Sequence, residues 1–356
     1  MAINPNDFTT TIDNPYFSLK PGTTFVYKTL DGSEVVRFVV TRETQVVDGV
    51  TCVVVNDTSV ENGVLHESTR DYFAQDLNGN VWYFGEDVKN YVDGKFDNTN
   101  GSWLAGVNGA DPGIVMQAVP VVGQTYNQEN APGIAEDKAT ILSLTAAVNV
   151  AYGDFSSVLQ THDFTPLELA LNEEKFYVSG LGLVRSDNRL TGESEALVRT
   201  EFDGTGQGET ITGNIGTDIL RGKGGSDTID GQGGHDRLDG GLGADILTGG
   251  LGGDSFDFNK ISDSGKSALT RDVITDFEHG KDKIDLQTLD AQLNQAGNQS
   301  FDFIGKHGFS HTGGELRYKA VSGVVVVEGD VNGDGRADFQ IELQGLTKLV
   351  AADFLL

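Results

Sequence analysis

A nine-residue unit repeats six times between Gly204 and Asp257, and this periodicity constrains the fold more than any other feature of the sequence. Glycine occupies the first position of every unit, an acidic residue the sixth, and an apolar residue the eighth. A flexible glycine-rich linker would leave the apolar eighth position unexplained. The pattern therefore predicts stacked copies of one supersecondary unit.

The repeat predicts a right-handed parallel β-roll. We expect the last three residues of each unit to form a short strand whose middle side chain points inward, and two units to make one coil. The inward residues are then Ile211, Leu220, Ile229, Leu238, Leu247 and Phe256. The acidic residues of alternate units share an edge, so one edge holds Glu209, Asp227 and Asp245 and the other holds Asp218, Asp236 and Asp254.

The same positions favour calcium. Glycine reaches backbone conformations that turn carbonyl oxygens inward, and Ca²⁺ takes six to eight oxygen ligands. The unit resembles the calcium-binding nonapeptide of repeats-in-toxin (RTX) proteins. The resemblance implies several Ca²⁺ ions, and the candidate ligand positions in the repeats are Asp218, Asp227, Asp236, Asp245, Asp254, Gly222, Gly225, Gly231, Gly234, Gly240, Gly243, Gly249 and Gly252. Because Glu209 and Gln207 depart from the pattern, we expect the first unit to be a cap with a weak or absent site.

Composition agrees with a cation-binding chain. The 356 residues carry a net charge of −28 and include 47 glycines. This length suggests two or three domains, and the charge disfavours nucleic acid and anionic membranes as partners. We expect the repeats to be disordered without calcium, because they combine little apolar surface with dense like charge.

Cysteine content and hydropathy indicate whether the chain has disulfides, membrane spans or a cleaved secretory signal. Cys52 is the only cysteine, which excludes an intrachain disulfide, and it reads as a small buried strand residue. No apolar run is long enough to span a bilayer, and the first residues lack the features of a cleaved secretory signal.

The segment after the repeats has a second resemblance. Asp272–Phe277, Lys281–Leu286, Gly314–Tyr318 and Ala352–Leu356 are similar to the C-terminal part of serralysin-type secreted metalloproteases. The resemblance implies export by a type I ABC system that reads the extreme C-terminus, although these residues also suit a final strand that simply packs. It implies no protease activity, because the sequence has no HExxH zinc motif.

A second candidate cation motif lies in this segment, at Asp330, Asn332, Asp334 and Asp338. Its start matches an EF-hand loop, but Ile341 stands where the final bidentate glutamate belongs. Its flanks, Val324–Glu328 and Phe339–Leu343, read as strands. Two interpretations stay open: a strand-loop-strand calcium site, and an Asx-rich hairpin turn.

Residues 1–203 read as an antiparallel β domain. Hairpin signals at Asp31-Gly32, Asp48-Gly49, Asn62-Gly63 and Asn78-Gly79 separate alternating strand patterns. The predicted strands are Thr23–Lys28, Glu34–Val40, Thr51–Asn56, Thr69–Gln75, Asn80–Phe84, Lys138–Leu144, Val158–Thr165, Glu174–Val178 and Gly182–Ser186. Asn14–Phe17, Asn80–Gly85 and Gly180–Val184 resemble an uncharacterised secreted bacterial β-domain family.

A candidate site in this domain rests on aromatic residues beside carboxylates. Trp82, Tyr83, Phe84, Tyr91 and Trp103 lie near Glu86, Asp87 and Asp111 in sequence. Such a set suits carbohydrate binding or glycoside chemistry, and it equally suits a sheet core. His66-Glu67 and His162-Asp163 offer a base, but no serine or cysteine nucleophile motif accompanies them.

We therefore expect an all-β chain: an antiparallel meander or half-barrel in 1–203, a parallel β-roll in 204–257, and a C-terminal β cap in 258–356. The predicted function is a secreted calcium-binding protein whose first domain is an extracellular binding or adhesion module, with a polysaccharide or surface ligand as partner. The alternative is a secreted hydrolase or lyase acting on an extracellular polymer, with its active site in 1–203.

Overall fold

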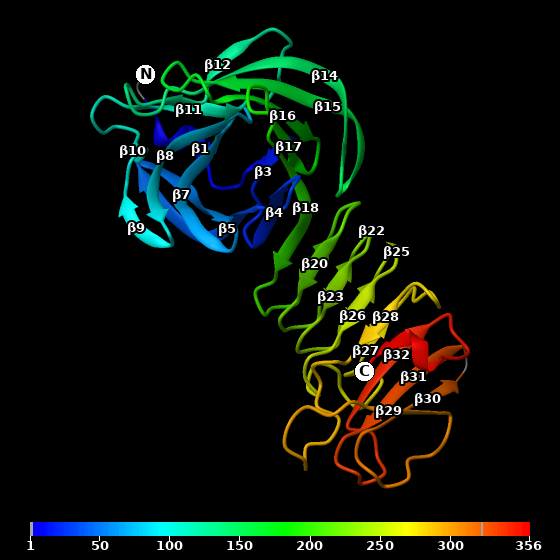
Figure 1. The fold of residues 1–356 in the computed structure, drawn as a ribbon. Coiled ribbons are helices and arrows are strands. Elements are labelled where there is room, and N and C mark those ends of the chain that lie inside the picture. Colours follow the sequence, from blue (N-terminus) through cyan, green and yellow to red (C-terminus); the bar gives the residue numbers. More distant parts are fainter. Residues whose placement is uncertain (1–2, 322) are drawn as a thin grey trace. The chain divides into compact units, whose positions relative to one another are not determined.

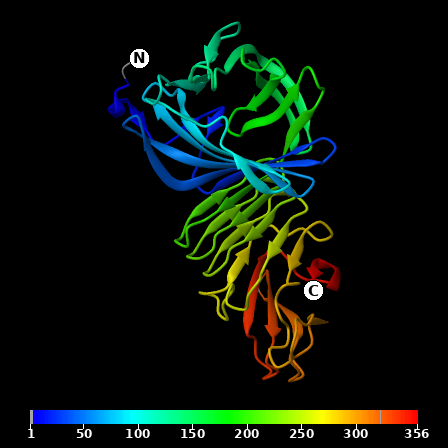
Figure 2. The same cartoon turned by 60° about the vertical axis from the view of Figure 1, so that its left-hand side comes forward.

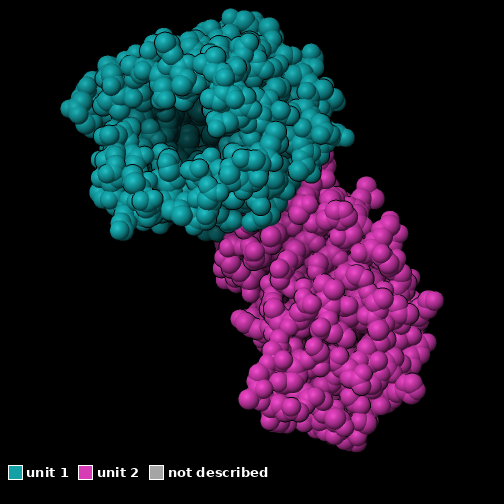
Figure 3. Space-filling view, in the orientation of Figure 1, with its two compact units in different colours: residues 1–200 teal, residues 201–356 magenta. Residues whose placement is uncertain are grey.

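The computed structural model describes residues 3–321 and 323–356, and the chain divides into two compact units, residues 1–200 and 201–356 (Figure 3). Both units are built from β-strands. The described residues contain two short 3₁₀ helices, Pro5–Asp7 and Ala351–Asp353, and no α-helix. None of the described helices is long and apolar enough to cross a membrane.

The first half of unit 1 is an antiparallel meander, as predicted. Its strands are longer than the sequence patterns indicated: β4 (Thr23–Thr29), β5 (Glu34–Val47), β6 (Val50–Glu61), β7 (Val64–Asp76), β8 (Val81–Val92) and β9 (Lys95–Asn98). Asp48 and Asn62 adopt positive φ values before Gly49 and Gly63, which is the conformation that a tight two-residue hairpin turn requires. Each turn therefore sets the register of the long strands on both sides.

The second half of unit 1 continues the sheet and bends it. A ladder of five antiparallel strands follows, with bounds β14 (Lys138–Val150), β15 (Gly153–Phe164), β16 (Asn172–Val178), β17 (Gly182–Asn188) and β18 (Ser194–Asp203). Shorter strands link the halves: β10 (Trp103–Leu104), β11 (Asp111–Met116), β12 (Thr125–Asn127) and β13 (Glu129–Asn130). Because β18 also pairs with β4, the sheet curls nearly into a barrel (Figures 1 and 2).

Short N-terminal strands complete unit 1: β1 (Phe8–Thr9), β2 (Asp13–Asn14) and β3 (Phe17–Ser18). β1 pairs with β7, and the Phe8 ring packs edge-on against both Trp82 and Phe84. Tyr83 instead stacks on Phe73, so the side chains of β8 alternate between the two faces of the sheet here. Cys52 is fully buried in the core of this unit.

Unit 2 begins as a parallel β-roll, whose strands form the rungs seen in Figures 1 and 2. The rungs are β19 (Thr210–Thr212), β20 (Asp218–Arg221), β21 (Thr228–Asp230), β23 (Arg237–Asp239), β24 (Ile246–Thr248) and β26 (Ser255–Asp257), with β22 (Gly233–Gly234) and β25 (Leu251–Gly252) in the turns. Each rung pairs in parallel with the rung two repeats later, as in Ile211↔Ile229 and Leu220↔Leu238. The six predicted inward side chains are at most 1% exposed.

The parallel pairing does not stop at residue 257. It continues through β27 (Asp272–Ile274) and β28 (Lys283–Asp285) to β32 (Phe339–Gln344) and β33 (Phe354–Leu355). One inward column is thereby extended by Ile274 and Leu343, and the other by Ile284 and Phe354. The antiparallel strands β30 (Glu315–Val321) and β31 (Val324–Asp330) join β32, and β29 (Asp302–Gly305) lies at the edge, so the end of the roll is capped.

Candidate functional site

The sixth-position carboxylates of unit 2 form two ladders along the edges of the roll. Asp218 N–H donates to Asp236 Oδ1 at 2.8 Å, and Asp236 N–H donates to Asp254 Oδ1 at 2.9 Å. On the other edge, Glu209 N–H donates to Asp227 at 2.7 Å and Asp227 N–H to Asp245 at 2.8 Å. These links join residues of alternate repeats, in the grouping that the sequence predicted.

The second oxygen of each ladder carboxylate is hydrogen-bonded at the start of the ladders and unpaired further along. Glu209 accepts bonds from the backbone N–H and hydroxyl of Thr205, and Asp218 Oδ2 accepts one from Asn214 N–H at 2.5 Å. Further along, the Oδ2 atoms are buried without a hydrogen-bond partner among the described residues, in side chains at most 2% exposed: Asp227, Asp236, Asp245, Asp254 and Asp272. Unpaired buried acceptors are costly, so this series indicates a missing partner.

The raised pKa values of the ladder carboxyl groups also indicate that a partner is missing. Burial, with the charges of Asp218 and Asp254, raises the pKa of Asp236 to about 8. Burial likewise raises the pKa of Asp245 to about 6 and that of Asp272 to about 9, with neighbouring carboxylates adding to the effect. A cation between stacked carboxylates would relieve this repulsion and satisfy the orphaned oxygens.

Sequence reasoning missed two members of the ladders. Asp245 N–H donates to Asp272 Oδ1 and Asp254 N–H to Asp282 Oδ1, both at 3.0 Å. These residues follow their ladder neighbours by 27 and 28 positions, whereas the repeats place the neighbours 18 apart. The sequence did contain a signal. In Asp272-Val-Ile and Asp282-Lys-Ile, an aspartate is followed two residues later by an isoleucine, as the sixth and eighth positions of the repeat require.

The glycines of the repeats shape the turns around these oxygens. An ideal Cβ on Gly222, Gly231, Gly240 or Gly249 would overlap the Oδ2 atom of the aspartate in its own turn. At the fourth position, Gly225, Gly234, Gly243 and Gly252 have φ between 101° and 154°. Both positions therefore require glycine, the first because of the carboxylate and the fourth because of the backbone.

Side chains alone do not make a metal site here. Within residues 3–321 and 323–356, no three His, Cys, Asp or Glu side chains gather closely enough to hold a metal ion. A calcium site in these turns would draw most of its oxygens from backbone carbonyls, with one or two carboxylates added.

The loop after β31 differs from the repeat turns. Asp330 accepts hydrogen bonds from Gly333 N–H and Gly335 N–H at 2.7 and 2.8 Å. Asn332 accepts from Asp334 N–H, and Asp338 accepts from Val331 N–H and pairs with Lys266 at 3.1 Å. These bonds are those of an Asx-rich turn between two strands. Calcium binding by Asp330, Asn332, Asp334 and Asp338 stays a prediction.

Unit 1 holds a second candidate site in its interior, which opens as a hollow on the face shown in Figure 3. A cavity of about 300 Å³ lies inside the curled sheet. Phe17, Phe38, Phe73, Tyr83 and Tyr177 supply aromatic walls. The lining also contains six carboxyl groups, Asp57, Glu67, Asp71, Glu86, Glu129 and Asp137, and one cationic side chain, Lys175.

Strand register brings these carboxyl groups together. Asp71 on β7 lies directly opposite Glu86 on β8, and Tyr83 donates its hydroxyl hydrogen bond to Asp71 at 2.6 Å. β11 places Gly113 beside Tyr83 and pairs Pro112 with Glu129. Like charges directly opposite each other destabilise a sheet, so the arrangement carries a cost in the folded state.

Protonation offsets part of that cost. Burial raises the pKa of Glu86 to about 8, with the nearby Glu129 charge adding to the effect. Burial raises the pKa values of Asp57, Asp71 and Glu129 to about 8 as well. Lys175 pairs with Glu173 at 3.2 Å and lies 3.4 Å from Asp163, so its charge is shared with carboxylates outside the cavity lining. Carboxyl groups with perturbed pKa values in a cavity mark a candidate functional site.

The structure separates the aromatic and acidic residues that the sequence had grouped. Tyr83, Glu86 and Trp103 lie together, because β10 places Trp103 directly opposite Glu86. Trp82 and Phe84 pack on the other face, and Tyr91 packs on Phe96. Asp87 binds the Tyr72 hydroxyl at 2.5 Å, and Asp111 is exposed at the start of β11.

Neither His66 nor His162 lines the interior cavity. His66 is exposed and lines a separate polar cavity of about 350 Å³ beside Glu34, Glu61 and Glu193. His162 binds the Asn172 side chain at 2.9 Å and stacks on Phe164. Both therefore have local structural partners or solvent around them.

Comparison with known proteins bears on unit 2. Residues 194–356 match the family model described as Peptidase M10 serralysin C terminal. Two solved structures with 26% identity are the AlgE6R3 and AlgE6R2 subunits of the Azotobacter vinelandii mannuronan C5-epimerase. They cover 43% and 42% of this chain and 80% and 92% of their own, with TM-scores of 0.32 and 0.29. No curated protein sequence matches the chain.

Proposed function

We propose that this chain is a secreted, calcium-binding protein of the RTX type, in which unit 2 folds on calcium and unit 1 binds an extracellular ligand. The observation that carries the calcium proposal is the series of buried Oδ2 atoms without partners, from Asp227 to Asp272. Every second repeat contributes its carboxylate to the same edge, where it faces the same kind of turn, so one type of ion would suit all of these sites.

The residues present fit Ca²⁺. Hard carboxylate and carbonyl oxygens are the ligands that this ion prefers, and glycine-rich turns supply the carbonyls. In this proposal the carboxylates come from Asp218, Asp227, Asp236, Asp245 and Asp254 of the repeats and from Asp272 beyond them, with the turns at Gly222, Gly225, Gly231, Gly234, Gly240, Gly243, Gly249 and Gly252. Asp282 continues the ladder but already has backbone donors on both oxygens. When bound, calcium would supply the positive charge that lets the ladder carboxylates stay ionised inside the roll.

Secretion is supported by the family match of residues 194–356. Type I export passes an unfolded chain, and calcium is scarce in cytoplasm and abundant outside the cell. A roll that folds only on calcium would suit that route. In this structure Asp353 contacts His279 at 3.0 Å and Phe354 is buried against the roll, so the same residues also serve packing.

Unit 1 is proposed as the binding module, because its interior combines aromatic walls with carboxyl groups in a cavity open to solvent. A specific observation favours an enzymatic alternative, a hydrolase or lyase acting on an extracellular polymer. Asp71, Tyr83 and Glu86 form a linked acid-hydroxyl-acid set inside the cavity, and such sets suit acid–base chemistry.

The test of the proposed function has two parts. The full chain, purified without calcium, is titrated with Ca²⁺ while circular dichroism and bound ion are followed, and cooperative folding with several ions is expected. The calcium-loaded chain is then incubated with washed cell-surface material and with insoluble polysaccharides, and retention is measured. Failure to bind calcium would refute the RTX assignment, and failure of retention on every surface would refute the binding module.

A release assay distinguishes the enzymatic alternative. The same polymers are incubated with the wild type and with the Asp71→Asn/Glu86→Gln variant, and soluble sugar products are measured. Product release by the wild type that the variant lacks would favour the enzyme over the binding module.

A further inference from the structure

The interior cavity of unit 1 places a continuous aromatic wall beside acidic groups. The Phe73 ring contacts three other rings of the lining, with centroid distances of 5.4 Å to Phe17, 6.3 Å to Phe38 and 4.7 Å to Tyr83. The Tyr83 hydroxyl donates to Asp71 at 2.6 Å, so the wall ends at a carboxyl group. Aromatic ring faces carry partial negative charge and attract cations. The wall and the carboxyl groups therefore favour the same sign of ligand charge.

Carboxyl oxygens in this cavity are available to a ligand. Asp71 is only 6% exposed, and its Oδ1 atom accepts the Tyr83 hydroxyl. Its Oδ2 atom has no hydrogen-bond partner within the described residues and, unlike the enclosed Oδ2 atoms of the ladders, retains accessible surface where Asp71 lines the cavity. Glu129 also lines the cavity, is partly exposed, and makes no side-chain hydrogen bond within residues 3–321 and 323–356. Carboxyl groups buried to this degree normally have donors, so a ligand that donates hydrogen bonds would complete them.

The charge balance of the lining favours a cation over an anion. Its six carboxyl groups come from β6, β7, β8, β13 and the segment before β14, and they face one cationic side chain, Lys175 on β16. Lys175 already pairs with Glu173 and Asp163. Tyr83 and Tyr177 are the other titratable groups of the lining, and burial raises the pKa of both, so they stay neutral.

Without a bound cation, protons balance these charges. Burial and neighbouring carboxylates raise the pKa values of Asp57, Asp71, Glu86 and Glu129 to about 8, so these groups are mostly protonated at pH 7. A carboxyl group with such a pKa gives up its proton at pH 7 at a cost of about tenfold in a binding constant. Contact of an ammonium group with the resulting carboxylate and with aromatic ring faces offsets that cost. Binding of a cation should therefore release protons.

An organic cation fits this cavity better than a metal ion. In the part of the chain that the structure describes, no three acidic side chains gather closely enough to hold a metal ion. The strands that carry the carboxyl groups also use their backbone carbonyls in sheet pairing, so few further oxygens are available as ligands. The carboxyl groups are therefore spaced for a larger cation.

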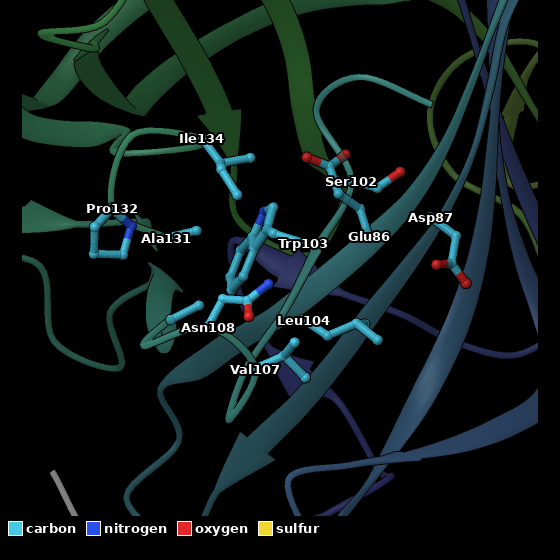
Figure 4. A pocket seen from close by; sticks show the side chains of 11 residues that line it. Glu86, Asp87, Ser102, Trp103, Leu104, Val107, Asn108, Ala131, Pro132 and Ile134 are labelled. Atoms are coloured by element: carbon cyan, nitrogen blue, oxygen red, sulfur yellow. The ribbon is translucent and has the colours of Figure 1, made fainter. Parts of the chain in front are cut away.

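Two smaller cavities adjoin the interior cavity. One has a volume of about 210 Å³ and is lined by Trp103, and it shares only Glu86 with the interior cavity (Figure 4). The other is mostly apolar and has a volume of about 180 Å³. It shares four lining residues with the interior cavity: Phe17, Phe38, Asp57 and Leu183. The apolar cavity therefore offers the wider place for an apolar group attached to the cation.

We infer that the interior cavity of unit 1 binds an organic ammonium ion, whose charged group lies between the aromatic wall and the carboxyl groups of Asp71 and Glu129 and whose apolar part enters the cavity beside Phe17 and Phe38. The inference rests on the proposed binding function of unit 1 and names its ligand class. The ammonium group belongs either to a free small molecule or to a surface polymer, and the test separates these two sources.

The test uses the full chain in calcium and three probes that share a benzene ring and differ in charge. Benzylamine, benzyl alcohol and benzoate are titrated by calorimetry, in two sulfonate buffers of different ionisation enthalpy, so that the protons released on binding are counted. Chitosan oligomers are titrated as well, because they carry the ammonium group on a polymer. Glu129→Gln removes one carboxyl group of the cavity. Glu168→Gln is the matched control, since Glu168 is exposed and lines neither the interior cavity nor its apolar neighbour.

We expect benzylamine to bind as its ammonium ion with release of protons at pH 7. It should bind more tightly at pH 8 than at pH 6, because fewer protons must then be displaced. Benzyl alcohol and benzoate should bind more weakly by about tenfold or more. Glu129→Gln should weaken benzylamine binding by about fivefold, and Glu168→Gln should bind like the wild type.

Equal or tighter binding of benzyl alcohol or benzoate, binding without proton release, equal affinity of the two variants, or no benzylamine binding would each overturn the inference. If the chain is still retained on cell-surface material in that last case, the binding function stands with another ligand class. Binding of both benzylamine and chitosan oligomers would support the inference with a polymer as the source of the ammonium group. Binding of benzylamine alone would support it with a free small molecule as the ligand.

Discussion

The edges of the roll in unit 2 and the interior of unit 1 both enclose carboxyl groups close to one another, and they accommodate them differently. In the roll, each ladder carboxylate takes a backbone N–H on one oxygen, and from Asp227 to Asp272 the other is left unpaired. In unit 1, Asp71 and Glu86 face each other across two strands, and the Tyr83 hydroxyl donates to Asp71. The first arrangement suits a metal ion, and the second suits protons or an organic cation.

This difference shows that buried acidic clusters can be distinguished by the hydrogen-bond donors that their carboxyl oxygens already have. The loop at Asp330 makes a third case, because both oxygens of that carboxylate are bonded to backbone N–H groups. Such a loop is stable as a turn without an ion. The predictions below test whether calcium dependence follows the unpaired oxygens.

Calcium removal should have the largest effect. With EDTA, we expect unit 2 to unfold because its ladder carboxylates lose their counter-ions, while unit 1 stays folded. Both tryptophans belong to unit 1, so tryptophan emission should be unchanged while circular dichroism loses much of its β signal. Excess Ca²⁺ should restore the signal. Simultaneous loss of both signals would contradict the separation.

Alkaline pH should destabilise unit 1. Asp57, Asp71, Glu86 and Glu129 have pKa values raised to about 8 in the folded state, against about 4 for exposed carboxyl groups. Their contribution to stability is therefore full below about pH 4 and is lost as pH rises through about 8. In calcium buffer, the urea midpoint followed by tryptophan emission should fall between pH 6 and pH 9.

The control for this pH effect is Glu86→Gln, which removes one titrating group and should flatten the dependence. Glu173 pairs with Lys175, and this charge lowers the pKa of Glu173. Its contribution to stability therefore has the opposite pH dependence, since it is lost only as the pH falls into the acidic range. An unchanged midpoint from pH 6 to pH 9 would show that these carboxyl groups are ionised in the folded state.

Asp236→Asn should raise the calcium midpoint by about tenfold or more, because it removes a charged ligand between two neighbours on its edge. The asparagine oxygen can still accept the Asp218 N–H, so the ladder bond is kept. Glu209→Gln is the matched control at the end of the roll, where both oxygens are bonded within their own turn. Equal effects of the two substitutions, measured in one calcium titration series, would refute the proposed register of sites.

Asp272→Asn tests whether calcium binding extends beyond the repeats. Its Oδ2 atom is unpaired like those of Asp227 and Asp245, so we expect a few-fold rise in the calcium midpoint. Asp330→Asn should leave that midpoint unchanged, because Asp330 already has backbone donors on both oxygens. The opposite ranking would move the calcium site from the roll to the loop.

The smallest expected effect is a difference in the free energy of unfolding between the Trp82→Phe and Trp103→Phe variants. Trp82→Phe leaves Asp76 without one of its donors and should lower the free energy of unfolding by about 1 kcal/mol. Trp103→Phe breaks no hydrogen bond and should cost less than that. Urea unfolding in calcium, followed by the remaining tryptophan in each variant, measures both values.

Much of unit 2 was predictable because its order is local and periodic. The nine-residue period assigned the inward residues from Ile211 to Phe256 and placed Asp218, Asp236 and Asp254 on one edge. It failed at Asp272 and Asp282, because the segment between Asp257 and Asp272 interrupts the period while the strands continue to stack. Stacking depends on backbone pairing, which tolerates an excursion between coils.

In unit 1, the sequence by itself determined the meander, since hairpin turns such as Asp48-Gly49 and Asn62-Gly63 set neighbouring strands locally. Only the tertiary structure decided that Asp71, Glu86 and Trp103 share one face, and that Glu129 reaches them from a later strand. The physical reason is that strand register alternates side chains with a period of two, and a bulge between Asp71 and Phe73 shifts it. The repeats carry their register in the sequence, whereas the interior of unit 1 acquires its register only when distant strands pair.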